Sequence, residues 1–195
     1  MRGFTLTVLP RETTMGTPAL LDRYELLAAW HHLIPKAELA GRYQYELDEL
    51  GEAILNPPPS ARRQIVLTDV YCHLTEHIGH LAAMSVAVTT PSFGIRIPDV
   101  VWMSCDKWEG FDRDDPVPFV PDLCVEVLLD SDRAQDVDRR VDSYLEGGAR
   151  EVIVIGQCGQ VEYWGANGKR QASEFGMALS LDRMYFEEGA VFRLR

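Results

Sequence analysis

The run Leu123-Cys124-Val125-Glu126-Val127-Leu128-Leu129 is apolar except for Glu126. A short apolar run of this kind is typical of a central strand that is buried on both faces. Helical spacing of apolar residues predicts a helix over 132–146, and Gly147-Gly148 stands where such a helix should end. A second apolar strand is expected at 152–155. The strand–helix–strand unit therefore predicts two parallel strands joined by a right-handed crossover.

The segments around this unit predict further helices and strands. Pro57-Pro58-Pro59 excludes regular structure, and Ser60 is a suitable N-cap for the helix that follows. Helices are expected at 18–32 and 60–81, and strands at 43–47, 52–55, 85–88, 94–103 and 161–164. Short turns should make the early strands antiparallel. The prediction is an α/β (α+β) fold with a mixed central sheet flanked by helices. Residues 1–16 are expected to be an N-terminal arm, and 17–195 a single domain.

Composition and charge limit the functions that fit. The chain has 195 residues, 46% of them hydrophobic, and a net charge of −11. So acidic a chain argues against tight non-specific nucleic-acid binding over its whole surface, although a local arginine-lined groove remains compatible. No stretch approaches the roughly 18 apolar residues of a membrane span, and no signal peptide is recognisable. Four widely spaced cysteines without a CxxC pair favour reduced, mostly buried thiols and a cytoplasmic location.

Two carboxylates lie in stretches that are predicted to be buried strands, where an unpaired charge is energetically costly. Glu126 lies inside the apolar run, and Asp99 precedes Val100-Val101-Trp102-Met103. A buried charge costs several kcal/mol unless it is paired or binds a metal. A hard divalent cation held by both carboxylates would remove that cost. Asp99 could instead cap a turn, and Glu126 could reach solvent from the strand end, so both alternatives stay open.

A series of short motifs follows in a fixed order. They are Tyr45-Glu46-Leu47-Asp48, Gly51-Glu52, Asn56-Pro57-Pro58-Pro59, Arg63-Gln64, Ile97-Pro98-Asp99-Val100-Val101, Pro121 to Leu128, Asp136 to Tyr144, and Gly148-Ala149-Arg150-Glu151. Each is weak alone, but their order and spacing resemble the Uma-two family of putative restriction endonucleases, within the PD-(D/E)xK nuclease superfamily. The resemblance runs from about Tyr45 to Trp164.

The resemblance implies a restriction-endonuclease-like fold and a metal-dependent phosphodiesterase site. Asp99, Glu126 and the backbone carbonyl of Val127 would hold Mg²⁺ or Mn²⁺, and Glu46 would assist. The family lysine is expected at the position of Arg140, and a family histidine at that of Arg63. Arginine can clamp a phosphate but cannot serve as a base, because its pKa exceeds about 12.

The expected function is therefore a Mg²⁺-dependent endonuclease acting on nucleic acid, with DNA as the anticipated substrate and hydrolysis weakened by Arg140. A catalytically silent interaction or regulatory module is the alternative. An ion pair between Arg140 and Asp136, four residues apart on one helix, is compatible with either function. No membrane partner is expected, and a homodimer remains an option.

The run His73-Leu74-Thr75-Glu76-His77 offers a competing metal motif. Its H-x-x-E-H pattern is that of inverted zinc peptidases, and His80 lies one turn further on. The histidines flank the apolar stripe of the predicted helix rather than forming its centre. We therefore expect surface histidines, and a chain that folds without zinc.

Overall fold

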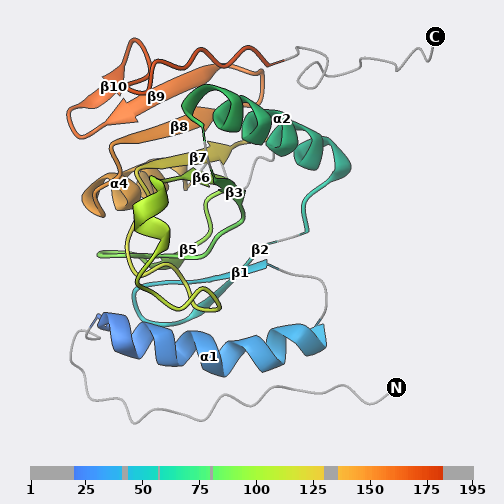
Figure 1. The fold of residues 1–195 in the computed structure, drawn as a ribbon. Helices are drawn as coiled ribbons and strands as arrows, with labels where there is room; N and C mark the ends of the chain where they lie inside the picture. Colours follow the sequence, from blue (N-terminus) through green and yellow to red (C-terminus); the bar gives the residue numbers. More distant parts are fainter. Residues whose placement is uncertain (1–19, 41–43, 57, 80, 130–135, 182–195) are drawn as a thin grey trace.

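The computed structural model describes residues 20–40, 44–56, 58–79, 81–129 and 136–181. The strands in these residues form two sheets (Figure 1). The four-stranded sheet has the order β2-β1-β5-β4, from β1 (Gln44–Leu47), β2 (Ala53–Asn56), β4 (Val88–Thr90) and β5 (Gly94–Arg96). The six-stranded sheet has the order β10-β9-β8-β7-β6-β3. Its strands are β3 (Ala82–Met84), β6 (Val100–Trp102), β7 (Leu123–Val127), β8 (Glu151–Ile155), β9 (Val161–Gly165) and β10 (Gly168–Arg170).

Strand β7 occupies the core of the six-stranded sheet, as the apolar run predicts. All its residues are buried. It pairs with β8 in parallel and with β6 in antiparallel orientation, so the sheet is mixed and the α/β (α+β) class is confirmed.

Helices cover both faces of this sheet. Helix α2 (Ala61–Ile78) packs on the face that carries Val125 and Val127, whereas α4 (Val137–Glu146) packs on the face that carries Cys124. Helix α2 begins at Ser60, whose hydroxyl accepts a hydrogen bond from a backbone N–H of the first turn. Alternation along β7 places Glu126 on the α4 face.

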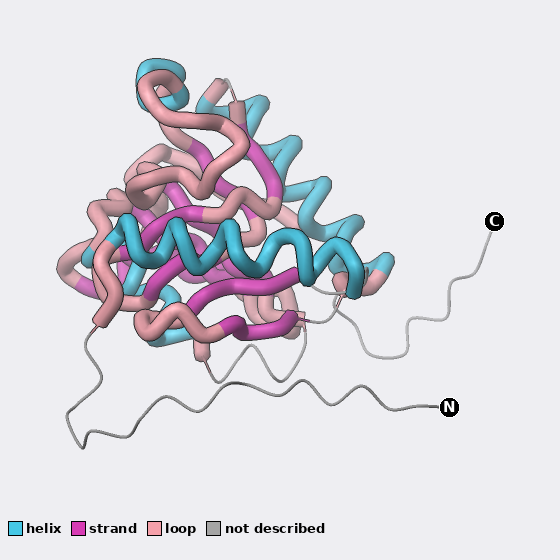
Figure 2. Tube along the Cα trace, turned by 90° about the horizontal axis from the view of Figure 1, so that it is seen from below, coloured by secondary structure: helices cyan, strands magenta, loops and turns pink. Residues whose placement is uncertain are grey.

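Helix α1 (Arg23–Ala40) belongs to the smaller sheet. It lies across that sheet (Figure 2), and its Leu26 and Trp30 form a small core with Leu47 of β1 and Ile95 of β5. A short 3₁₀ helix, η1 (Cys105–Trp108), follows β6.

One difference from the sequence prediction decides the architecture. The stretch expected as a single strand over 94–103 is two strands in two different sheets, because Ile97-Pro98-Asp99 interrupts it. Pro98 has no backbone N–H to donate to a sheet ladder. The expected single central sheet is consequently two sheets, and Glu46 on β1 can approach Glu126 on β7 from the other sheet.

Other boundaries also differ from expectation. The first helix spans 23–40 rather than 18–32, the second ends at 78 rather than 81, and the strand expected at 85–88 is replaced by β3 and β4. The predicted arm, 1–16, and residues 132–135 of the predicted 132–146 helix lie outside the described residues. Cys72, Cys105 and Cys158 are exposed and only Cys124 is buried, so the expectation of mostly buried thiols is wrong. Among the described helices, none combines the length and apolarity that crossing a membrane requires.

Candidate functional site

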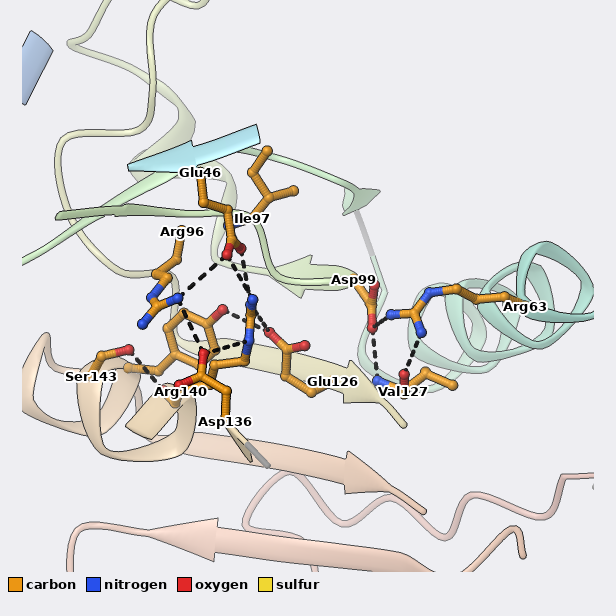
Figure 3. A network of polar contacts seen from close by, with 11 residues as sticks. Glu46, Arg63, Arg96, Ile97, Asp99, Glu126, Val127, Asp136, Arg140 and Ser143 are labelled. Atoms are coloured by element: carbon orange, nitrogen blue, oxygen red, sulfur yellow. Dashed lines mark hydrogen bonds and ion pairs between the residues drawn. The ribbon is translucent and has the colours of Figure 1, made fainter. Parts of the chain in front are cut away.

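A buried ion-pair network lies between the two sheets and α4. The guanidinium of Arg140 donates two hydrogen bonds to Glu46, from Nη1 to Oε1 at 2.9 Å and from Nη2 to Oε2 at 2.6 Å (Figure 3). Its Nη1 also lies 3.3 Å from Oε1 of Glu126. All three side chains are almost entirely buried. Arg140 thus links a carboxylate of the four-stranded sheet to a carboxylate of the six-stranded sheet.

Further polar groups surround these three residues. The hydroxyl of Tyr144 donates to Oε1 of Glu126 at 2.7 Å, and the backbone N–H of Ile97 donates to Oε1 of Glu46 at 2.8 Å. Nη1 of Arg96 lies 3.4 Å from Glu46 and 3.3 Å from Asp136. Oδ2 of Asp136, the N-cap residue of α4, also lies 3.5 Å from Nε of Arg140, so the expected ion pair four residues apart exists together with the cross-sheet contacts.

The charges in this network shift one another's pKa values. Burial raises the pKa of Glu46, but the charge and hydrogen bonds of Arg140, the amide of Ile97 and the charge of Arg96 together hold that pKa below its ordinary value. Burial lowers the pKa of Arg140, but the negative charge of Glu126 and further anionic groups raise it on balance. Burial, followed by the charge of Glu126, raises the pKa of Tyr144 well above its usual range. Glu46 and Arg140 therefore stay ionised as a pair.

Asp99 and Val127 belong to a second cluster at the start of α2. Arg63 is buried in the first turn of that helix, and its Nη2 donates to Oδ2 of Asp99 at 2.5 Å. Its Nη1 donates to the carbonyl of Val127 at 2.7 Å. Oδ2 of Asp99 also accepts the backbone N–H of Val127 at 2.7 Å. Figure 3 shows this closed ring of contacts beside the Arg140 network.

The predicted site residues are thus held by two arginines in two neighbouring clusters. Glu46, Glu126 and Arg140 contact one another directly, whereas Asp99 and Val127 are bridged by Arg63. The backbone keeps the clusters close, because the N–H of Asp99 donates to the carbonyl of Val125, one residue before Glu126.

The implied metal does not fit the donors as they are arranged. Two of its three expected donors, the Asp99 carboxylate and the Val127 carbonyl, already bind the guanidinium of Arg63. The third, Glu126, accepts hydrogen bonds from Tyr144 and Arg140. Among the described residues, no group of three or more His, Cys, Asp or Glu side chains is placed to hold a metal ion.

Sequence reasoning did not single out Arg96, which is 2% exposed in β5. The signal was available, because Arg96 interrupts an apolar stretch between Ile95 and Ile97 in the way that Glu126 interrupts its own strand. Tyr144 was predicted only as the last residue of the motif from Asp136 to Tyr144. Its hydroxyl bond to Glu126 depends on the packing of α4 against β7.

The competing histidine motif lies on the outside of α2. His73 and His77 have ring centroids 5.9 Å apart, and Nδ1 of His77 contacts the backbone carbonyl of His73. Nε2 of His73 lies 3.9 Å from Asp69. His80, expected as a third imidazole, lies outside the described residues. The described part of the motif is thus engaged in contacts along its own helix.

Comparison with known proteins identifies the relatives of the chain. The family model of Uma2, described as "Putative restriction endonuclease", matches residues 31–184. A crystal structure of a putative nuclease belonging to DUF820 from Anabaena variabilis superposes with a TM-score of 0.58 at 15% sequence identity. The match covers 73% of this chain and 88% of that chain, which shows a shared fold. No curated protein matches the chain.

Proposed function

The chain belongs to the Uma2 family of putative restriction endonucleases, and from this premise we propose that it is directed at nucleic acid, as a DNA endonuclease with slow or absent hydrolysis. The proposed reaction centre comprises Glu46, Asp99, Glu126 and Arg140. Any turnover would need the Mg²⁺ or Mn²⁺ that the family resemblance implies.

The observation that carries this proposal is the position of Arg140. Its guanidinium lies between Glu46 and Glu126, on the helix where the resemblance expects the family lysine. An arginine there supplies a fixed positive charge beside the carboxylates but no proton acceptor. Both of its terminal nitrogens are already engaged, because Glu46 binds them through two hydrogen bonds. A scissile phosphate would have to compete with Glu46 for this group, which supports slow hydrolysis.

A catalytically silent interaction or regulatory module is the second candidate. It is favoured by the fact that Glu46, Asp99 and Glu126 each accept a hydrogen bond from an arginine within the described residues. A carboxylate network neutralised in this way can hold the fold together without any catalytic role.

Cleavage of single- and double-stranded DNA separates the two candidates. The wild type, Arg140→Lys and Asp99→Asn are compared at matched Mg²⁺ or Mn²⁺ concentration. We expect weak or no cleavage by the wild type, a gain for Arg140→Lys because lysine restores the family's usual group, and none for Asp99→Asn. Arg139→Lys is the matched control, since Arg139 is the neighbouring residue and its side chain is 58% exposed.

Two results would change the conclusion. Robust metal-dependent cleavage that survives Asp99→Asn would mean that the chemistry lies elsewhere in the chain. An Arg140→Lys variant as inactive as the wild type, although both bind Mg²⁺, would favour the silent module.

A further inference from the structure

Arg63 is the residue whose position has the clearest chemical consequence. Its backbone N–H donates to the hydroxyl of Ser60 at 3.2 Å, which fixes the residue in the first turn of α2. Its side chain is 5% exposed and points away from solvent toward the end of β7 (Figure 3). A buried guanidinium without partners would be strongly unfavourable, so the groups that surround it must compensate its charge.

The groups that compensate Arg63 are the donors expected for a metal. Nη2 binds the carboxylate of Asp99 and Nη1 binds the carbonyl of Val127, at 2.5 and 2.7 Å. A carboxylate and a backbone carbonyl are the hard oxygen donors that Mg²⁺ and Mn²⁺ prefer. The guanidinium therefore joins the same two oxygens that a divalent cation would join.

We propose that the guanidinium of Arg63 takes the place of the divalent metal at the oxygens of Asp99 and Val127. Replacing Arg63 by a neutral residue should then create a Mn²⁺ or Mg²⁺ site at these two residues. This inference rests on the proposed function only for the location of the site. The guanidinium and a divalent ion need the same two oxygens, and their positive charges would repel each other if both were bound there. Metal binding to the wild type therefore requires the guanidinium to leave two charge-assisted hydrogen bonds.

The test measures Mn²⁺ binding to the full chain, by electron paramagnetic resonance of free Mn²⁺ and by calorimetry. The variants are Arg63→Ala and Arg63→Gln. The second keeps an uncharged polar side chain at this position, so it protects the experiment against a misfolded alanine variant. Arg62→Ala is the matched control, because it removes the same charge from an exposed position in the same helical turn. Circular dichroism checks that each variant folds.

We expect one new Mn²⁺ site in Arg63→Ala and Arg63→Gln. Its Kd should be at least about 100-fold lower than that of the wild type, in which the ion must first displace two charge-assisted hydrogen bonds of Arg63. Arg62→Ala should behave as the wild type. Adding Asp99→Asn to Arg63→Gln should abolish the new site, and adding Mn²⁺ should raise the Tm of Arg63→Gln but not that of the wild type.

The proposal is overturned if folded Arg63→Gln binds Mn²⁺ no better than the wild type. It is also overturned if the wild type itself binds Mn²⁺ tightly and Asp99→Asn abolishes that binding. DNA cleavage, measured separately, distinguishes this inference from the proposed function. Mn²⁺ binding by Arg63→Gln without cleavage, even when Arg140→Lys is added, supports the role of Arg63 and contradicts the nuclease. Asp99-dependent cleavage by the wild type at a Mn²⁺ concentration as low as the one that fills the site of Arg63→Gln supports the nuclease and contradicts the role of Arg63.

Discussion

Replacing Arg140 by methionine tests whether the network between the sheets is as strongly coupled as its geometry indicates. The change removes two hydrogen bonds to Glu46 and the contact with Glu126, and it leaves two carboxylates buried beside an apolar side chain. Removing one partner of a buried ion pair typically costs about 3–5 kcal/mol. Arg96 lies 3.4 Å from Glu46 and compensates only one of the two carboxylates directly. For a chain of this size the cost corresponds to a fall in Tm of about 6–20 °C.

The assay is urea and thermal unfolding of wild type and variant at pH 7. Arg139→Met is the control, because Arg139 is exposed, 3.7 Å from Glu49 and 4.6 Å from the centre of the Phe93 ring, so its loss should cost no more than about 1 kcal/mol. The double variant Arg140→Met with Glu46→Gln should recover part of the lost stability, since it also removes the buried carboxylate that loses two hydrogen bonds from Arg140. A loss below about 1 kcal/mol for Arg140→Met would refute the argument, since it would mean that the carboxylates find other partners or water.

The pH dependence of the same variants provides a second check. In the wild type the pKa of Glu46 is lowered from 4.5, so its contribution to stability is present above pH 4.5 and is lost as the pH falls toward the folded-state pKa. Without Arg140, burial is opposed only by the Ile97 amide and the charge of Arg96, so the folded-state pKa of Glu46 should rise. The carboxylate would then contribute less to stability at pH 7, and less would be lost on acidification. The stability difference between wild type and Arg140→Met should therefore narrow as the pH falls. A constant difference would show that Glu46 is not the group left uncompensated.

Two further perturbations follow from the structure. His73→Ala combined with His77→Ala should change the free energy of unfolding little, because the described contacts of the two histidines lie along their own helix. Stoichiometric zinc in the wild type, purified without added metal, that is lost together with the fold in the double variant would contradict this expectation. Gly94→Ala should destabilise the chain by at least about 1–2 kcal/mol, because φ at Gly94 is +77° and a Cβ there would overlap the carbonyl oxygens of Leu47 and Asp48. Gly110→Ala is the control, since φ at Gly110 is +87° but a Cβ there would meet nothing within 4 Å. Comparing the unfolding of the two variants separates the cost of the overlap from the cost of the backbone strain.

Local sequence determined the elements around the site. The apolar run at 123–129 could only lower its free energy by burial on both faces, and it became β7 at the centre of the six-stranded sheet. Ser60 after the triple proline marked the start of α2 because its hydroxyl can accept from the first turn. The parallel pairing of β7 with β8 followed from the helix between them. The order of motifs was sufficient to identify the family.

The tertiary structure decided which charges meet. From the sequence, Glu126 and Asp99 were two costly carboxylates with a metal as the expected remedy. In the fold, Arg140 comes from a helix packed on one face of the sheet and Arg63 from a helix packed on the other. Arg140 contacts Glu46, 94 residues away in the sequence, as well as Glu126, and Arg63 contacts Asp99, 36 residues away. Burial of a charge can be inferred from its apolar neighbours, because burial depends on local patterning. The identity of its partner cannot be inferred in this way, because a guanidinium and a metal ion satisfy the same oxygens, and only the packing of the helices determines which of the two arrives.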